Sequence, residues 1–523
     1  MSFESTQSWA AKKASNWLNK NYELQTSLAG LKYSFPNKFK INELYIPDEE
    51  GDTLIYSKSL RFQLTAFNSK SNSLIAHDIE LIDAKYYQLI KEGDSLSNLQ
   101  KFTRKFKSNA PKEEKPSFKL NLKRIIFKNS NFRLEDINCD VCTTFWLENI
   151  DLDLKKFDLD GPEIMANINR LKSKNKYHFD IDNLQGDFLY SAEELSLKDA
   201  IIETPLSYLK GSFSLNYDST KAFKNFLEEV NINANFSDSS QVASEDIETF
   251  ADKFPRFGDI GIEGLITGTV NNLKADAIVF RWGESSIFQG NLNILDPGNK
   301  ESFYIKAEDA LLLSSSEDIE NMIGVFTDSA MPPQIALLED IEFNGSFNGF
   351  LDEFRTNGSL KSSLGLVSAN LFFDNKQLDM VAYQGQLTLD QFDLAKVVGD
   401  SSFGRLSADM SLNGKGFDPN EMETSLLANV DLFEFKDYPY QGTKIDGSIS
   451  KGNFIGELQI NDPNLKFDFN GQASLNREIS QYDFKAKLDT ANLFALNLST
   501  DSISNISSEM DINFKAKNYD RWQ

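Results

Sequence analysis

The sequence predicts an all-β protein with mainly antiparallel strands, and two observations lead to this conclusion. The first is an alternation of apolar and polar residues with a period of two, clearest at residues 118–127, 150–154, 465–471 and 482–489. The second is a recurring turn signal: Asn-Gly at 344, 357, 413 and 470, Asp-Gly at 446, and Lys-Gly at 210, 415 and 451. Strands with one wet and one dry face are typical of antiparallel sheets, and the absence of long βαβ periods disfavours an α/β enzyme fold.

Helical spacing is confined to short segments. Residues 6–21 are predicted to form an N-terminal helix, because Trp9, Lys12, Lys13, Asn16 and Trp17 recur at helical spacing. This helix either lies at a membrane surface or plugs the end of a sheet. Shorter helices are predicted at 218–230, 244–254, 315–323 and 391–399, as lids or edge caps on the sheet.

One exposed break divides the predicted sheet. Residues 108–117 carry two prolines around four charged residues, which predicts a linker between a first β unit at 24–107 and an extended, repeating β region at 118–523. Neither a signal peptide nor an apolar run long enough to span a bilayer is found in the sequence. The sequence ends shortly after a strand-like pattern, with no closing element, and we expect the chain to be a piece of a longer protein.

Charge and cysteine content limit the possible partners. The net charge is −24 and basic clusters are short, such as the run at 101–107, which we interpret as a solvated loop or helix end. Nucleic acid is therefore not expected as a partner. Cys139 and Cys142 are either inert, joined in a local disulfide, or less favourably a redox or metal pair.

Catalytic signatures are weak. His77 and His178 are isolated in the sequence, and no Gly-x-Ser-x-Gly elbow is present. Most aspartates alternate with apolar residues, which places them on the wet faces of strands. We predict no enzyme activity, no cofactor and no metal site.

The arrangement of these segments resembles the AsmA-like and TamB families of Gram-negative envelope proteins. The resemblance begins in the first β unit, at 31–35, 41–62 and 79–84, and is stronger at 311–417. There the order is a capped helix, a connector with Pro332 and Pro333, the segment 341–349, Gly358 with Gly365, and the segments 383–387 and 404–416. The resemblance rests on pattern and carries no catalytic motif.

The resemblance implies an elongated antiparallel β-groove, a half-pipe or β-taco, in place of a closed sandwich. It implies a periplasmic protein, anchored in the inner membrane through a segment missing from this chain, whose groove carries phospholipid acyl chains between inner and outer membrane. An Omp85-type outer-membrane barrel is the implied partner. The predicted groove-lining residues are apolar members of alternating strands: Phe343, Phe347, Leu371, Phe373, Phe467, Phe469, Phe484 and Leu488.

Two other functions remain open from the sequence. The sheet edge of a scaffold or chaperone could accept strands of nascent outer-membrane barrels. A carbohydrate-binding or carbohydrate-active β-solenoid is the further alternative, although five scattered Trp residues offer few sugar platforms.

Overall fold

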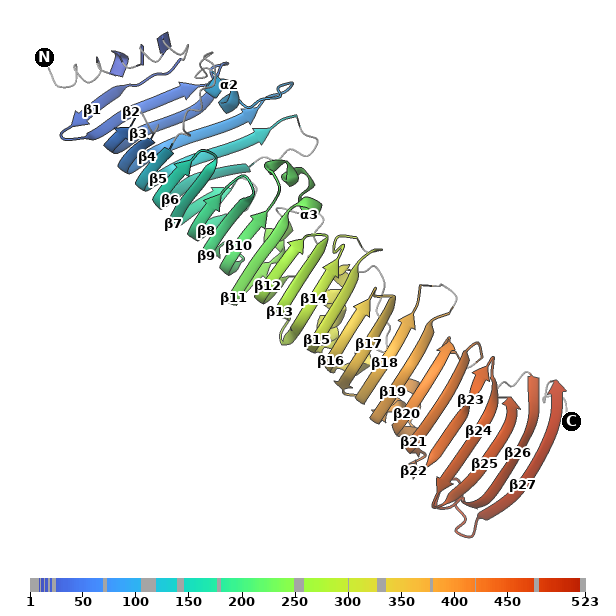
Figure 1. Cartoon of the computed structure of the whole chain (residues 1–523). Helices are drawn as coiled ribbons and strands as arrows, with labels where there is room; N and C mark the ends of the chain where they lie inside the picture. Colours follow the sequence, from blue (N-terminus) through green and yellow to red (C-terminus); the bar gives the residue numbers. More distant parts are fainter. Residues whose placement is uncertain are drawn as a thin grey trace. The chain divides into compact units, whose positions relative to one another are not determined.

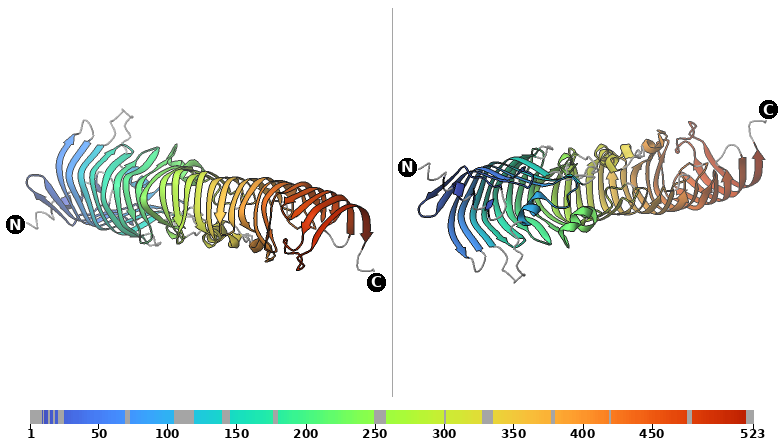
Figure 2. Two further views of the ribbon diagram at one scale, coloured as in Figure 1. Left: turned by 90° about the horizontal axis from the view of Figure 1, so that it is seen from below. Right: turned by 90° about the horizontal axis from the view of Figure 1, so that it is seen from above.

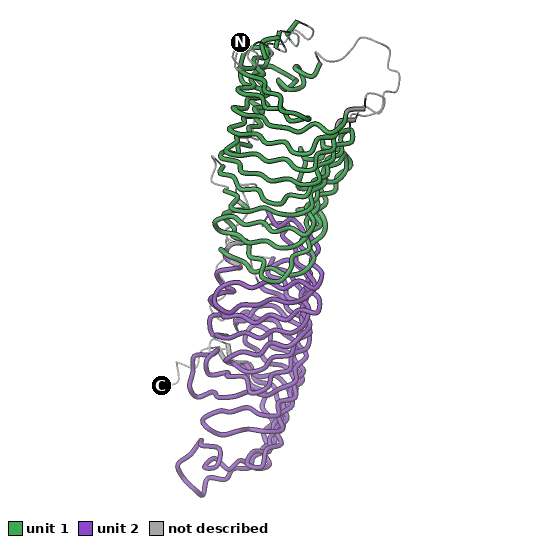
Figure 3. The backbone as a smooth tube through the Cα atoms, turned by 90° about the vertical axis from the view of Figure 1, so that its left-hand side faces the viewer, with its two compact units in different colours: residues 1–270 green, residues 271–523 purple. Residues whose placement is uncertain are grey.

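Two compact units, residues 1–270 and 271–523, make up the chain in a computed structural model (Figure 3). The structure describes all residues except 1–8, 10, 14, 17, 18, 21–24, 69–72, 105–118, 139–144, 176–179, 249–257, 300, 327–334, 377–379, 419, 475–478 and 518–523. The predicted linker at 108–117, His178 and both cysteines lie outside the described residues. Within the predicted N-terminal helix, the described residues are helical: Trp9, Ala11, Lys12, Lys13, Ser15, Asn16, Asn19 and Lys20.

Unit 1 is one sheet in which each strand pairs with the next along the chain (Figure 1). Its strands are β1 (Gly30–Ser34), β2 (Lys38–Pro47), β3 (Thr53–Asn68), β4 (Ser73–Ile90), β5 (Lys119–Asp136), β6 (Phe145–Asp160), β7 (Glu163–Asn175), β8 (Ile181–Tyr190), β9 (Glu194–Glu203), β10 (Tyr208–Asn216), β11 (Asn231–Ala243) and β12 (Asp259–Thr269). All these pairings are antiparallel except β4 with β5, which is parallel. Since β4 and β5 lie on either side of the predicted linker, the sheet continues across it.

The strands of unit 2 are antiparallel and pair in the same sequential order (Figure 1). Its strands are β13 (Asn272–Trp282), β14 (Ser286–Leu295), β15 (Tyr304–Ser315), β16 (Asp340–Gly349), β17 (Glu353–Ser362), β18 (Gly365–Asp374), β19 (Ala382–Asp393), β20 (Phe403–Lys415), β21 (Glu423–Phe435), β22 (Tyr438–Tyr440), β23 (Thr443–Ser450), β24 (Asn453–Asp462), β25 (Leu465–Ser474), β26 (Ile479–Asn492) and β27 (Asn505–Lys517). The short β22 pairs with the end of β21, and β23 pairs with the rest of it. The predicted all-β, antiparallel fold with short helices is confirmed.

Short helices lie between strands in both units, close to where the sequence predicts them. They are η1 (Thr220–Asn225), α3 (Phe226–Glu229), α4 (Ser244–Glu248), α5 (Ser316–Phe326) and α6 (Leu394–Val398). Two further helices, α2 (Asn98–Arg104) and η2 (Ile335–Leu338), were not predicted. The first of them covers the start of the basic run at 101–107.

The interpretation of the Asn-Gly and Asp-Gly pairs as turns is wrong. Each pair lies inside a strand, as Asn344-Gly345 does in β16 and Asp446-Gly447 does in β23. Gly345 lies directly opposite Gly358, and a Cβ added to Gly345 would approach the Asn357 carbonyl oxygen to 2.3 Å. Gly345 and Gly358 therefore allow the backbones of their two strands to approach closely. The strands are curved in each unit (Figure 2).

Bulges add to this curvature. Asp83, Asn129 and Asn149 have positive φ inside β4, β5 and β6, which are consecutive in the sheet. The Asn129 side-chain amide donates to the Asp83 carboxylate at 2.6 Å. Bulges bend a strand and increase its twist, and Asn and Asp tolerate the left-handed backbone that a bulge requires. Asn and Asp residues in these strands therefore do more than face solvent, because they also bend the sheet.

Helices α4 and α5 begin with the same five residues, Ser-Glu-Asp-Ile-Glu, and are held by the same contact. In α4, Asp246 accepts hydrogen bonds from Thr204 at 2.6 Å and from Ser207 at 2.5 Å. In α5, Asp318 accepts one from Ser286 at 2.6 Å. Helix α4 follows β11, and its aspartate bonds to Ser207, just before β10. Helix α5 follows β15, and its aspartate bonds to Ser286, the first residue of β14.

Removing this contact is expected to loosen the helix. For Asp318→Ala we expect a loss of about 1–2 kcal/mol, because Ser286, which is buried, loses a charge-assisted hydrogen bond. Hydrogen exchange at 316–326, together with the melting temperature, measures the effect. The matched control is Glu317→Ala, which removes an exposed carboxylate on the same turn. Equal exchange in the two variants would contradict the assigned role.

Candidate functional site

Within unit 2 the strand register produces an apolar row across the sheet. The row consists of residues that lie directly opposite one another on successive strands, so they share one face. From β18 to β27 its members are Ala369, Leu387, Met410, Ala428, Ile445, Leu458, Phe469, Ala486 and Met510. Only its two buried alanines, 428 and 486, are shielded from solvent; the others are partly exposed.

Unit 1 has a corresponding row. It crosses β1 to β10 through Leu31, Ile41, Leu60, Leu81, Phe127, Leu152, Leu171, Leu184, Ile202 and Leu209. Every member is a large apolar residue, and every one is partly exposed. A sheet packed against a second layer would bury such a row, so each unit carries an apolar face that its own chain covers incompletely.

All eight residues predicted to line the groove lie on the apolar face of unit 2. They form two groups, one on β16 and β18 and one on β25 and β26. Phe354 connects the first group, because its ring lies 5.0 Å from that of Phe347 and 5.1 Å from that of Phe373. In the second group the rings of Phe469 and Phe484 are 5.0 Å apart, and Phe467 lies opposite Leu488. The register brings the members of each group together; their contact with lipid stays a prediction.

A cavity of about 400 Å³ lies on the apolar face between the two groups. Ala408, Ala428 and Val430 lie at the floor of the cavity. Their side chains are small, so space is left between the larger side chains around them. Aromatic residues form one wall, and Thr443 and the Tyr440 hydroxyl are the polar groups among the lining side chains. The lining residues are Leu406, Ala408, Met410, Leu426, Ala428, Val430, Phe433, Phe435, Tyr440, Thr443, Ile445, Leu458 and Ile460.

A buried carboxylate fixes the aromatic wall. Asp462, which is 1% exposed, accepts hydrogen bonds from the Tyr438 hydroxyl at 2.5 Å, the Gln441 backbone N–H at 3.1 Å and the Asn464 backbone N–H at 2.8 Å. Burial raises the pKa of both Tyr438 and Tyr440, which favours the protonated hydroxyl that Tyr438 uses to donate to Asp462. The strand β22 is thereby held against the end of the cavity.

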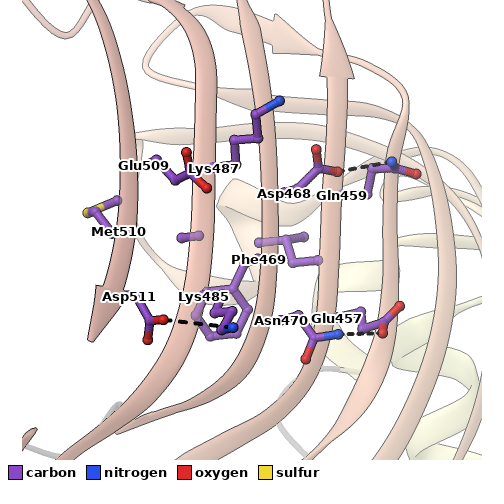
Figure 4. Close-up of a pocket in the computed structure, with 12 residues that line it drawn as sticks. Glu457, Gln459, Asp468, Phe469, Asn470, Lys485, Lys487, Glu509, Met510 and Asp511 are labelled. Atoms are coloured by element: carbon purple, nitrogen blue, oxygen red, sulfur yellow. Dashed lines mark hydrogen bonds and ion pairs between the residues drawn. The ribbon is translucent and has the colours of Figure 1, made fainter. Parts of the chain in front are cut away.

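On strands β24 to β27, the face opposite to the large apolar side chains is polar (Figure 4). Two rows of charged and amide side chains cross these strands. One row contains Glu509, Lys487, Asp468 and Gln459, and the other contains Asp511, Lys485, Asn470 and Glu457. Neighbours within a row interact, as Asn470 donates to Glu457 at 2.6 Å and Gln459 to Asp468 at 3.0 Å. A hollow of about 450 Å³ on this face is lined by these eight residues and by the intervening residues Leu458, Phe469, Ala486 and Met510.

Catalytic or metal-binding constellations are not evident in the part of the chain that the structure describes. There, no group of three or more His, Cys, Asp or Glu side chains is placed to hold a metal ion. His77 lies in β4. Also among the described residues, no helix has both the length and the apolar character needed to cross a bilayer. The predictions of no enzyme activity and no cofactor stay predictions.

The sequence did not single out the cavity. Apolar and polar residues alternate at 406–412 as clearly as around the eight predicted residues. Alternation within one strand, however, does not show which residues lie beside it on the neighbouring strands. The signal that distinguishes them is size: Ala408 and Ala428 stand at inward positions where neighbouring strands carry larger residues, and the register is needed to recognise this. Comparison of the chain with family models, with curated proteins and with solved structures found no match.

Proposed function

We propose that the apolar face holds the acyl chains of phospholipids and guides them between an inner and an outer membrane, in support of outer-membrane assembly. The observation that carries the proposal is the pair of apolar rows whose large side chains stay partly exposed. Full burial of one Leu, Ile or Phe side chain stabilises by about 1.5–3 kcal/mol relative to full exposure, so a row of this length gains from an apolar occupant. The protein then acts in the periplasm without a catalytic step.

The chemistry of the two faces supports lipid over other cargo. The cavity offers alkyl and phenyl surface and few polar groups, which suits a hydrocarbon chain. A sugar site would need several hydrogen-bonding side chains at the same place. The polar face and the net charge of −24 keep the outside hydrated and separate from anionic headgroups.

Photocrosslinking at adjacent phenylalanines tests the proposal. Phe373 lies on the apolar face, whereas Phe372 lies on the polar face, where the Arg355 guanidinium is 4.5 Å from the centre of its ring. We expect p-benzoylphenylalanine at 373 to label phospholipid from phosphatidylethanolamine and phosphatidylglycerol vesicles, and the same probe at 372 to label little. Equal labelling at both positions, or capture of unfolded barrel polypeptide in place of lipid at 373, would overturn it.

A further inference from the structure

The cavity on the apolar face of unit 2 has one polar end. Tyr440 of β22 lies opposite Phe433, near the end of β21. Thr443, the first residue of β23, lies opposite Val430 of the same strand. Leu426, which also lines the cavity, is closer to the start of β21. The two residues that carry hydroxyl groups therefore lie toward one end of the cavity, and Leu426 lies toward the other.

Thr443 is an exception on the apolar face. Its neighbours at the same position on the two adjacent strands are Val430 and Ile460, and the next inward residue of its own strand is Ile445. In the described part of the chain, no residue forms a hydrogen bond with the Thr443 hydroxyl. A hydroxyl that is placed among apolar side chains is unfavourable unless it finds a hydrogen-bond partner.

The two tyrosines of β22 differ in their hydrogen bonds. The Tyr438 hydroxyl donates to Asp462 at 2.5 Å and accepts from the Asn464 side-chain amide at 3.0 Å. Tyr440 is 8% exposed, and yet its hydroxyl has no hydrogen-bond partner among the residues that the structure describes. Because buried tyrosine hydroxyls usually have a partner, a molecule that occupies the cavity is suited to supply the acceptor.

We infer that the Tyr440 and Thr443 hydroxyls bind the ester carbonyl that joins an acyl chain to glycerol in a phospholipid. This carbonyl accepts hydrogen bonds and is attached directly to hydrocarbon, so the acyl chain runs along the cavity toward Leu426. Gln441 and Gly442, which lie between the two binding residues, are exposed, so the headgroup faces solvent at this end. The inference rests on the proposed function and adds to it an orientation and a preference for ester-linked lipid.

Charge at this end of the cavity favours a neutral acceptor over an ionised one. The buried Asp462 carboxylate bonds to Tyr438, whose ring lies 4.8 Å from that of Tyr440. None of the described residues that line the cavity carries a positive charge. The carboxylate of a free fatty acid at Tyr440 would therefore be buried near a like charge without a cation, which is unfavourable. An ester carbonyl avoids this cost because it is uncharged.

Competition between ester-linked and ether-linked lipid tests the inference. The purified full chain is mixed with vesicles that contain equal amounts of dioleoyl phosphatidylethanolamine and its ether-linked analogue. The analogue keeps the hydrocarbon chains and the headgroup but lacks the carbonyl groups. We expect mass spectrometry of the bound lipid to show about a five-fold excess of the ester-linked form, which is the size of effect that hydrogen bonds to a neutral acceptor give.

Two substitutions remove the hydroxyls with little change of shape. Tyr440→Phe and Thr443→Val are each expected to reduce the excess, and the double variant is expected to bind the two lipids equally. Thr388→Val is the matched control: its hydroxyl donates to Asp409 at 2.6 Å and is exposed on the opposite face of the sheet, so the excess should persist. A melting temperature shows that each variant is folded.

The possible outcomes separate this inference from the proposed function. Equal binding of the two lipids by the parent chain, or an unchanged excess in the folded double variant, would overturn the ester site while leaving phospholipid as the cargo. A parent chain that binds neither lipid would overturn the proposed function together with the ester site.

Discussion

Replacing Leu426 by Asp is expected to reduce the phospholipid bound per chain by about ten-fold or more. Leu426 lies on β21, lines the cavity and is partly exposed, so a carboxylate there faces whatever occupies the cavity. An ionised group held against hydrocarbon without a partner costs several kcal/mol, and each 1.4 kcal/mol changes the binding constant about ten-fold. Mass spectrometry of lipid extracted from the purified chain measures the ratio.

The neighbouring residue supplies the control. Ser425 is exposed on the opposite face of the same strand, between Asn413 and Ser448. Ser425→Asp introduces the same charge one residue away, and we expect it to leave lipid binding unchanged. A melting temperature for each variant separates loss of binding from loss of folding. If both variants lost lipid equally while staying folded, the apolar face would not be the binding surface.

The sequence predicted the class of fold because alternation acts within a strand. Segments such as 465–471 carry their own evidence, since every second residue is apolar whatever the neighbouring strands are. The helices at α4 and α5 were found for a similar reason: Asp246 and Asp318 follow serines at helix starts, which is a local signal. What depends on one strand alone could be predicted.

Features that depend on the pairing of two strands could not be predicted from the sequence. Asn344-Gly345 has the composition of a tight turn, but its glycine is required by the approach of Gly358 from the next strand. The cavity likewise depends on Ala408 lying beside Val430, which only the register determines. The contact between Asp318 and Ser286 joins positions 32 residues apart, and no local pattern marks it.

The second large effect is expected at Lys91, which follows β4 and holds the turn between β2 and β3. Its ammonium lies 3.2 Å from the Asp48 carboxylate, 2.7 Å from Glu50 and 2.6 Å from Asp52. Asp48 is 7% exposed and also accepts hydrogen bonds from the backbone amides of Glu50 and Asp52. Lys91→Met leaves three carboxylates together without a cation, and we expect unit 1 to lose about 3 kcal/mol.

Denaturant unfolding, with hydrogen exchange in β2 and β3 to locate the change, measures this loss. Lys58→Met is the comparison, because Lys58 forms an exposed pair with Asp83 at 3.3 Å, and we expect a small change there. Comparable losses in the two variants would show that the partial burial of the Lys91 cluster has no energetic consequence.

The pH dependence gives an independent check. Burial alone would raise the pKa of Asp48, but hydrogen bonds from the Asp52 amide and from Lys91 outweigh it and hold that pKa below its ordinary value of 3.8. Asp48 therefore contributes stability above pH 3.8 that is lost as the pH falls through the lower, folded-state pKa. In Lys91→Met the cation is gone, and protonation in acid relieves the repulsion among the carboxylates. The difference in unfolding free energy between the parent chain and Lys91→Met should consequently shrink from pH 7 to below pH 3.8, and a difference that stayed constant would contradict the electrostatic role of Lys91.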